Sequence, residues 1–595
     1  MRSLVKNAIA AWLLASIADA APVEELVTHA ERSGFQETGR YEEVVRLCAA
    51  FQKAYPKHVR AIEFGRTPEG RPMLALVASR AGTLRAAEAK KRKLPVLLVQ
   101  GGIHAGEIDG KDASFLVLRE ALENKAPDSA LEKQVLLFVP VFNVDGHERF
   151  GAWNRPNQRG PSEMGWRTTA QNYNLNRDYM KADALEMQAM LRLINEWDPL
   201  ACMDLHVTDG AKFEPHISVQ VEPLYAGDEE LRKIGRAMRD ATLADLSGRE
   251  WLPLPFYPSF VTEDDPQSGF EDGVPPPRFS TTYFPLRNRF CVLVETHSWK
   301  DYPTRVRVMR DTIVSVMAQI ARHGGEWAKV ARDADARAAQ LGGQNFPLTY
   351  KATDKAQTIP FRGYEYTRTI SDISGALMTR YDESKPQVWH LPLRDDVQPA
   401  LSVAASRGGY IVPVAHAGWV AEKLRQHGVA FEVQKSVLAG ADVETFRATK
   451  VTFASESFEY HQTLALEGEW KPERRDLSAG ALFVPIAQPK SRLVVALLEP
   501  RAPDSLAAWG EFNGAFEQKE FMEAYVAEEV AWEQLAADPS LAAEFKRGVA
   551  EDPEFAGKPT ARLQFFAQRH SSWDERLNLY PVFRSAVPPA ELPRK

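Results

Sequence analysis

Residues 95–107 read Pro-Val-Leu-Leu-Val-Gln-Gly-Gly-Ile-His-Ala-Gly-Glu, and this stretch decides the fold. Its first six residues are nearly all apolar and too few for a helix, which is typical of a strand buried on both faces. Two glycines end the strand, and His104 and Glu107 follow in the loop that opens a predicted helix over residues 109–124. In open α/β sheets such strand ends form the usual ligand crevice. The stretch therefore predicts a buried strand with chemically active side chains at its end.

The same pattern recurs along the first half of the chain. Further short apolar runs predict buried strands at residues 135–142, 200–205 and 291–294, and helical spacing predicts a helix over 182–196. Strands that alternate with helices predict an α/β fold, with a mostly parallel or mixed sheet covered on both faces. Residues 255–278 interrupt the pattern with many prolines, glycines and acidic residues, and a loop of this length is commonly functional or disordered.

Two more strand ends carry residues that suit a metal centre. Asp204-Leu205-His206 ends one predicted strand, and Val294-Glu295 ends another. We expect His206, Glu295 and the His104/Glu107 pair to meet at one edge of the sheet. Two histidines and one glutamate form the three-ligand set of a catalytic zinc, which leaves the fourth position for water. Zinc lowers the pKa of such a water toward about 7, and Glu295 is then the natural general base.

In this combination the sequence resembles the zinc metallocarboxypeptidases of the carboxypeptidase A/B type. The resemblance covers about residues 23–335 and rests on His104-x-x-Glu107, Asn143-Val144-Asp145-Gly146, Asn174-Leu175-Asn176-Arg177, His206 and the Val294-Glu295 strand end, in the family's order. It implies a mixed, mostly parallel eight-stranded sheet between helices. It also implies one zinc per chain, held by His104, Glu107 and His206, with Glu295 as the base in hydrolysis of a C-terminal peptide bond.

The resemblance extends to the substrate contacts. Asn176 and Arg177 match the pair that holds the free C-terminal carboxylate of the substrate; the alternative for Arg177 is a salt bridge to Asp178. Asn174 stands where the family commonly has an aspartate that orients a zinc-bound histidine.

Two further roles in the family have several candidates here. For the arginine that stabilises the oxyanion we select Arg155, with Arg159 and Arg167 as alternatives. For the mobile tyrosine near the substrate carboxylate we select Tyr283 over Tyr257, since both flank the proline-rich loop.

The second half of the chain predicts a separate α/β region without a catalytic constellation. Gly342-Gly343 follow a predicted helix over residues 305–341, so we expect a catalytic unit over 23–341 and an accessory region over 345–595. The strands predicted in this region are residues 410–414, 429–434, 481–486 and 493–498, and the helices are residues 415–426 and 517–537.

The N-terminus and the composition bear on location. Arg2 and Lys6 precede an apolar stretch over residues 8–17, and Ala18-Asp19-Ala20 offers small residues for cleavage near Ala20. This is the pattern of a signal peptide, which predicts a secreted or periplasmic protein. No later stretch reaches the roughly 20 apolar residues of a membrane span. A net charge of −7, from 73 basic and 80 acidic residues, gives no basic field for nucleic acid.

Two alternatives to a carboxypeptidase stay open at this point. A zinc amidase or deacylase acting on cell-wall peptides or N-acyl amino acids would use the same metal site. A binding protein on an inactive peptidase scaffold belongs to another class, although such scaffolds lose a ligand or the base and this sequence keeps all four residues. The expected substrate is a peptide or peptide-like molecule with a free C-terminal carboxylate.

Overall fold

The central sheet has eight strands and is mixed, as the sequence predicts. The computed structural model of the chain describes residues 23–123, 125 and 127–589, so the predicted signal peptide lies outside the described residues. In spatial order the strands are β1 (Val59–Arg66), β2 (Pro72–Ala78), β4 (Val135–Val139), β3 (Val96–Gly101), β5 (Ala201–Val207), β9 (Phe290–Thr296), β6 (Ile217–Glu222) and β7 (Pro253–Leu254). The central strands β4, β3, β5 and β9 run parallel, and the pairs β1–β2, β2–β4 and β9–β6 are antiparallel.

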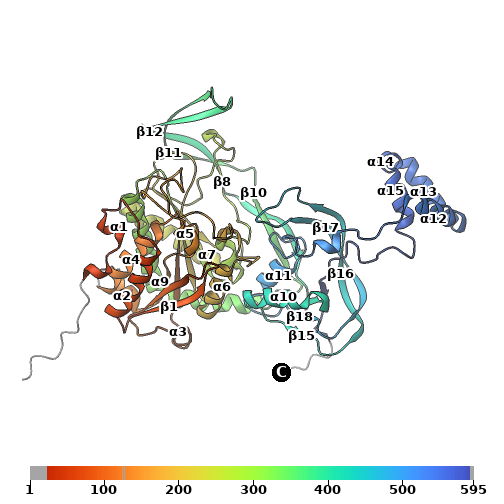
Figure 1. Ribbon diagram of the computed structural model, residues 1–595, viewed down its shortest axis with the longest axis horizontal. Helices are drawn as coiled ribbons and strands as arrows, with labels where there is room; N and C mark the ends of the chain where they lie inside the picture. The colour runs from red at the N-terminus through yellow and green to blue at the C-terminus, as the bar shows by residue number, and fades with distance from the viewer. Residues whose placement is uncertain (1–22, 124, 126, 590–595) are drawn as a thin grey trace, which may run out of the picture.

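Helices cover both faces of this sheet (Figure 1). One face packs against α2 (Tyr41–Ala54), α4 (Asp109–Leu122), α7 (Glu229–Gly248) and α9 (Tyr302–Ala338). The other packs against α6 (Leu185–Trp197) and α8 (Ser280–Leu286). The shorter helices of this half are α1 (His29–Arg32), α3 (Ala86–Arg92) and α5 (Val144–Glu148), with 3-10 turns η1 (Val23–Leu26), η2 (Pro127–Glu132), η3 (Leu175–Arg177) and η4 (Pro266–Ser268). Because the central strands are buried on both faces, their sequences are apolar throughout rather than alternating.

The C-terminal region contains a second, antiparallel sheet with helices beside it. Its strands, in spatial order, are β15 (Glu432–Val433), β18 (Leu482–Pro485), β14 (Gly409–Val412), β19 (Phe583–Ser585), β16 (Leu438–Phe453) and β17 (Leu464–Leu477). The helices α10 (Val414–His427) and α11 (Ser491–Leu498) pack against α6 and α8 of the first unit. A fold with a further α/β region is thus confirmed.

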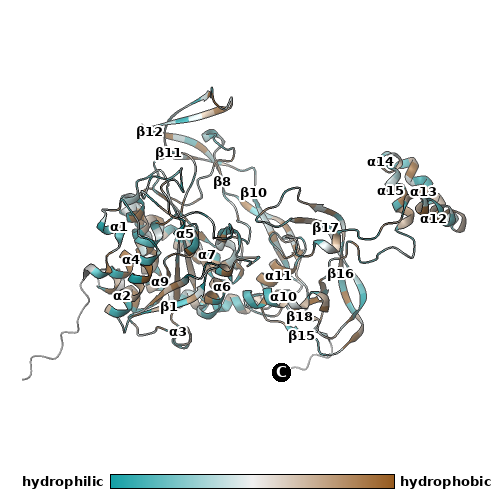
Figure 2. Cartoon of the chain, viewed as in Figure 1, coloured by the Kyte–Doolittle hydropathy of each residue, from teal (hydrophilic) through white to brown (hydrophobic). Residues whose placement is uncertain are grey.

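One predicted strand of this region is wrong. Residues 493–498 form most of the helix α11, not a strand. Every residue from Leu493 to Leu498 is buried, and Figure 2 shows α11 coloured mostly hydrophobic. A short helix that is enclosed on all sides has no polar face, so its sequence cannot be distinguished from that of a buried strand by periodicity.

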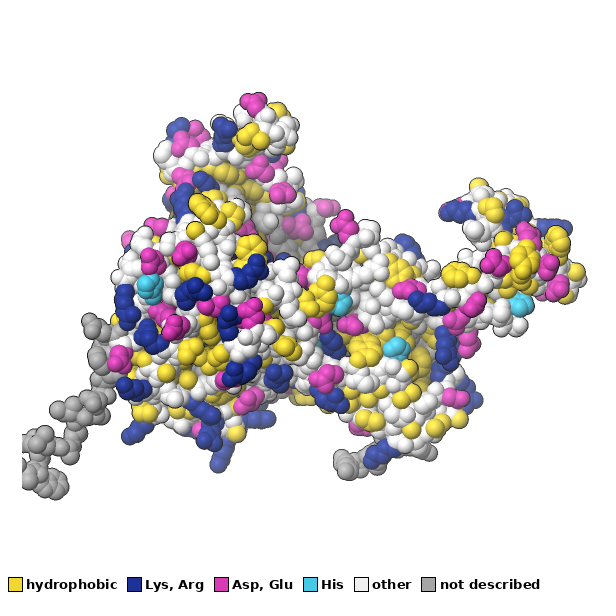
Figure 3. Space-filling model, viewed as in Figure 1, with side chains coloured by type: hydrophobic (Ala, Val, Ile, Leu, Met, Phe, Trp, Pro, Cys, Tyr) yellow, Lys and Arg dark blue, Asp and Glu magenta, His cyan; other side chains and the backbone are white. Residues whose placement is uncertain are grey.

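Two extensions leave the compact body. The strands β11 (Gln357–Ile370) and β12 (Leu377–Arg394) form a long hairpin that pairs with β8 (Phe270–Glu271), and β10 (Asn345–Ala352) pairs with β13 (Val397–Ala404). The helices α12 (Ala524–Ala537), α13 (Pro539–Glu551), α14 (Pro553–Gly557) and α15 (Pro559–Ala567) stand apart from the body beyond η5 (Asn513–Phe516) (Figure 1). On the face shown in Figure 3, basic and acidic side chains are interspersed. Among the described residues, no helix has the length and apolar content needed to cross a bilayer.

The two units share one hydrophobic core and a partly buried polar contact. The core cluster runs from Leu26 to Val582 without a break between the sheets. At the junction the Asp183 carboxylate lies 2.9 Å from Nε2 of His461 and accepts a hydrogen bond from Nζ of Lys423 at 2.7 Å. Burial opposes ionisation of Asp183, but the contacts with His461 and Lys423 hold its pKa well below the usual range.

We expect Asp183→Asn to lower the free energy of unfolding at pH 7 by about 3 kcal/mol, because the change leaves Lys423 without its charged partner. A carboxyl whose pKa is depressed by folding stabilises the protein above its unfolded pKa, and this stabilisation is lost as the pH falls toward the folded value. The difference between variant and wild type should therefore shrink below about pH 4. Urea unfolding at pH 7 and pH 3 measures it. Asp442→Asn, at a side chain 96% exposed, is the control, and equal losses in both variants would contradict the prediction.

Candidate metal centre and active site

Three neighbouring strand ends deliver the predicted residues to one place. His104 and Glu107 lie in the loop between β3 and α4, His206 lies near the end of β5, and Glu295 lies near the end of β9. His206 and Glu295 are direct partners in the parallel register of β5 and β9. Because β3, β5 and β9 are adjacent and parallel, their carboxyl ends meet at the same sheet edge, as the sequence analysis expects.

Glycines shape the loop that carries the first two residues. Gly102 has φ +61°, which an L side chain rarely adopts. A Cβ on Gly106 would lie 2.8 Å from Cδ of Arg155, so glycine lets this arginine approach the loop closely. The backbone N–H of Glu107 then donates to the carbonyl of His104, which closes a tight turn. The turn aims both side chains inward.

The three predicted ligands converge on one point. Nδ1 of His104 lies 2.9 Å from Oε1 of Glu107, and Nδ1 of His206 lies 3.0 Å from Oε2 of the same carboxylate. The candidate ligand atoms all lie within 4.8 Å of one another, and all three side chains are buried. Two imidazole nitrogens and a carboxylate at this spacing form the donor set of a catalytic zinc. The residues therefore fit the metal.

The second ring nitrogens of both histidines also have partners. Nε2 of His104 lies 3.2 Å from Oδ1 of Asn174, which can only accept, so Nε2 carries the proton and Nδ1 is left for a metal. Nε2 of His206 lies 3.1 Å from Oδ1 of Asp204, although the ring is turned away from a linear hydrogen bond. Such partners orient a ligating histidine and make it more basic. The structure thus places Asn174 where the resemblance implies.

Asp204 is a residue that the sequence analysis did not assign. It is fully buried, and its carboxylate accepts hydrogen bonds from the side chains of Gln100 at 2.8 Å and Ser280 at 2.6 Å. Burial opposes its charge, yet His206 and these donors lower the pKa of Asp204. The sequence does indicate that Asp204 lies beside His206, because residues two apart on a strand share a face and Asp204 is two residues before His206.

The charges at the centre act differently on the three candidate ligands. Burial opposes protonation of His206, but Asp204 and Glu295 raise its pKa well above the usual value, so a metal must displace its proton. Burial lowers the pKa of His104 to about 4, which keeps its imidazole neutral and able to bind a metal. Burial alone would raise the pKa of Glu107, but Arg155 and His104 hold this pKa well below the usual range. Burial, together with the nearby Glu107 charge, raises the pKa of Glu295 to about 8.

A cavity of about 450 Å³ opens over this centre. It is lined by the three candidate ligands, by Glu295 and by the predicted pair Asn176 and Arg177. Arg177 packs over the ring of Phe279 at 4.5 Å and makes no ion pair within the described part of the chain. The alternative partner, Asp178, instead binds Lys181 at 2.7 Å. The guanidinium of Arg177 is thus available to an anionic group in the cavity.

Of the three candidate arginines for the oxyanion role, the preferred one, Arg155, does not line the cavity in the structure. The side chain of Arg155 is buried behind the loop, donating to Oε1 of Glu107 at 2.6 Å and to Oδ1 of Asp209 at 3.0 Å, and it does not line the cavity. Arg159 points elsewhere and pairs with Glu383 of β12. Arg167 lines the cavity, and its Nη1 lies 3.3 Å from Oε1 of Glu107. The role expected of Arg155 therefore fits Arg167 better.

Tyr283 lies away from the cavity, contrary to the expectation. Its side chain is fully buried in α8, where its hydroxyl lies 3.0 Å from Nδ1 of His427 in the C-terminal region. The helix turns this residue toward the core, a direction that the sequence around it does not reveal. The other candidate, Tyr257, lines the cavity and is 39% exposed.

We expect Asp204→Asn to weaken zinc binding by about 10–100-fold, because the change removes the charge that supports His206. Competition with a chelator of known affinity measures the effect. Ser280→Ala removes a neighbour of Asp204 but keeps its charge, so its zinc affinity should stay closer to that of the wild type. An Asp204→Asn variant with unchanged affinity would show that Asp204 serves the fold alone.

Comparison with known proteins gives one family. Residues 44–250 match the family model of the M14 peptidases, described as zinc carboxypeptidase; the match includes His104, Glu107 and His206 and ends before Glu295. A search of the curated proteins finds no match.

Three solved structures illustrate what the chain is similar to. A metallo-carboxypeptidase from Burkholderia cenocepacia is 17% identical, with 47% of this chain and 68% of that chain covered and a TM-score of 0.35. A metallo-carboxypeptidase from Pseudomonas aeruginosa, in complex with (2-guanidinoethylmercapto)succinic acid, is 16% identical, with 48% and 69% covered and a TM-score of 0.35. Carboxypeptidase A from Helicoverpa armigera is 17% identical, with 51% and 75% covered and a TM-score of 0.34. Residues 44–250 of this chain, which carry the three candidate metal ligands, thus match the zinc carboxypeptidase family.

Proposed function

We propose that the protein is a zinc-dependent carboxypeptidase that hydrolyses the C-terminal peptide bond of peptides, with one zinc per chain. The observation that carries the proposal is the placement of Glu295 and Arg177 around a single cavity whose floor is His104, Glu107 and His206. A binding protein on an inactive scaffold has no need for this complete set.

The metal and Glu295 would divide the chemistry. Held by His104, Glu107 and His206, zinc would lower the pKa of a water and polarise the scissile carbonyl. Glu295 is buried beside this point and makes no hydrogen bond or ion pair through its side chain with any described residue. The positive charge of a bound zinc would favour the ionised form of Glu295. The carboxylate would then be free to accept the proton of the attacking water and later to pass it to the leaving amine.

Asn176 and Arg177 would fix the substrate by its end. A guanidinium binds a carboxylate through two parallel charge-assisted hydrogen bonds, which fixes orientation as well as position. Burial lowers the pKa of Arg177, with the neighbouring charge of Arg167 acting in the same direction, so an arriving carboxylate would supply the ion-pair partner that Arg177 lacks among the described residues. Arg167, on the cavity wall, is placed to stabilise the oxyanion that develops on the scissile carbonyl.

We also propose that the protein works outside the cytoplasm after cleavage near Ala20, and that residues 23–341 form the catalytic unit with 345–595 as an accessory region. N-terminal sequencing of the protein recovered from periplasm or medium tests the first point. A start near Ala21 is expected, and an intact N-terminus in the cytoplasmic fraction would contradict it.

The decisive experiment combines elemental analysis with a pair of peptide substrates. About one zinc per chain, with amino acids released from peptides with free C-termini and not from C-terminally amidated ones, supports the carboxypeptidase. One zinc with release of an acyl group from N-acyl amino acids, and none from peptides, indicates the amidase or deacylase instead. Absence of zinc from protein supplied with it would refute the metal centre.

A further inference from the structure

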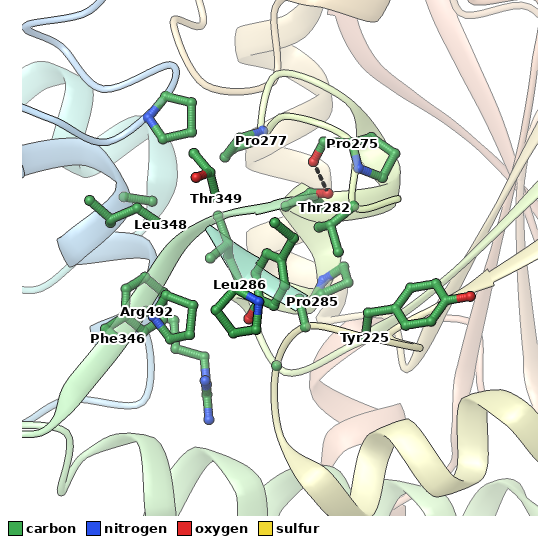
Figure 4. Close-up of a pocket in the computed structure, with 18 of the residues that line it drawn as sticks. Tyr225, Pro275, Pro277, Thr282, Pro285, Leu286, Phe346, Leu348, Thr349 and Arg492 are labelled. Carbon is green, nitrogen blue, oxygen red and sulfur yellow. Dashed lines mark hydrogen bonds between the residues drawn. The ribbon is translucent and has the colours of Figure 1, made fainter. Parts of the chain in front are cut away.

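A second cavity, larger than the one over the candidate metal ligands, lies elsewhere in the described structure. It has a volume of about 680 Å³ and lies between the two units, where α8 and the loop before it face β10 and α11 (Figure 4). Leu286, Phe346 and Leu348 form part of an apolar wall, and several prolines, including Pro275, Pro277 and Pro285, line the rest. Such a mixture of apolar walls and a few charged groups is typical of a small-molecule site.

The charged residues that line this cavity are all arginines. Arg492, at the start of α11, lines the cavity and makes no side-chain hydrogen bond or ion pair within the described residues. Its Nε is buried and has no partner. Burial lowers the pKa of Arg492, an effect that the more distant charge of Asp228 opposes. Asp228 itself is occupied, because it binds Arg337 through two hydrogen bonds of 2.8 Å.

Two more arginines, from the start of α7, line the same cavity. Arg236 donates to the carbonyl of Leu224 at 3.0 Å and makes no ion pair with a described residue. Arg232 pairs with Glu229, but its buried Nε has no partner. Arg236 is exposed, whereas the buried Nε atoms of Arg492 and Arg232 have no hydrogen-bond partner among the described residues. Such donors cost free energy, which a bound acceptor group would offset.

We propose that this cavity binds a small organic anion. Its carboxylate or phosphate group would be held by Arg492, Arg236 and Arg232, and its apolar part would lie against Phe346, Leu348 and the prolines. A guanidinium presents paired donors that match the oxygens of either group, which is why arginine is preferred for both. The site is independent of zinc and of the residues assigned to peptide hydrolysis.

The cavity is separate from the catalytic cleft but shares a wall with it. Val274 and Pro275 line both. The hydroxyl of Tyr225, which lines the new cavity, donates to Asp272 of the catalytic cavity at 2.8 Å, so this hydrogen bond spans the wall. An anion added to the protein could therefore bind on either side, and a test must separate the two.

The test uses phenyl phosphate, phenylacetate and inorganic phosphate as probes on the full chain, with benzylamine as a cation of similar apolar shape. Isothermal titration measures binding to wild type, Arg492→Gln and Arg177→Gln. We expect at least one organic anion to bind the wild type saturably. Its affinity should fall by about tenfold or more in Arg492→Gln and stay unchanged in Arg177→Gln. Benzylamine should not bind the cavity. Whichever of phenyl phosphate and phenylacetate binds more tightly identifies the preferred head group. Inorganic phosphate measures the affinity of a phosphate without an apolar part.

Folding of the variant is checked by its unfolding temperature without ligand. Because Arg492 makes no hydrogen bond, Arg492→Gln should melt at or above the wild-type temperature, and Arg236→Gln provides a second variant with the same expected loss of binding. The proposal is overturned if no anion binds wild type, if both arginine variants of the cavity bind as wild type does, or if binding is lost only in Arg177→Gln.

Discussion

Glu295→Gln is expected to lower kcat by about a thousandfold while zinc content stays at the wild-type value. The amide keeps the size of the side chain but cannot accept a proton from water. Glu295 is not among the atoms that converge on the metal position, so its change should leave the ligands in place. Steady-state kinetics on a peptide with a free C-terminus, with elemental analysis of the same preparations, measures both quantities.

A matched control separates loss of the base from loss of charge. Glu271 lines the same cavity, is exposed, and has no contact with the candidate ligands. Glu271→Gln should therefore keep kcat within a few-fold of wild type. Equal losses in both variants would mean that the cavity needs negative charge in general, and an active Glu295→Gln would remove Glu295 from the mechanism.

The fold of the first unit and the cluster of candidate metal ligands could be predicted because both depend on local patterns. A strand buried on both faces must be apolar throughout. The first polar residues in or just after the apolar run, such as His104 and His206, therefore mark the end of the strand. The parallel arrangement then brings such ends together without any knowledge of distant contacts. His104, Glu107, His206 and Glu295 are all specified in this way.

The errors concern residues whose position depends on contacts from far along the chain. Tyr283 is turned inward because α8 packs against the C-terminal region, where His427 meets its hydroxyl. Residues 493–498 form a helix that is fully buried and packs against α8. The long strands β16 and β17 carry many exposed polar residues, so no apolar run marks them. Local pattern carries little information in all three cases.

The C-terminal region reaches the active site, which the sequence does not indicate. The carboxylate of Glu459, in the loop between β16 and β17, accepts a hydrogen bond from the backbone N–H of Asn174 at 3.3 Å. The next residue, Tyr460, stacks on Tyr173 with ring centroids 4.5 Å apart. Asn174 supports His104, so the second unit helps to hold the residues around the metal position. The C-terminal region thus contributes contacts next to the candidate metal ligands.

The two arginines at Glu107 should respond differently to substitution, and the difference decides their roles. Arg167→Gln is expected to lower kcat by about 100–1,000-fold with zinc affinity little changed, because it removes a donor from the cavity wall where the oxyanion develops. Arg155→Gln should instead weaken zinc binding, since Arg155 is buried and holds the Glu107 carboxylate at 2.6 Å. Chelator competition and kinetics at saturating zinc separate the two effects.

At saturating zinc the contrast should be clearest. Arg155→Gln then recovers most of its activity, because its defect lies in holding a ligand, whereas Arg167→Gln does not recover, because its defect lies in the transition state. Arg159→Gln is the matched control, since Arg159 pairs with Glu383 outside the cavity and should have kcat near wild type. If Arg155→Gln retains full zinc affinity and loses kcat while Arg167→Gln is active, the assignment reverses, and the buried arginine must reach the oxyanion through a movement of the loop that carries it.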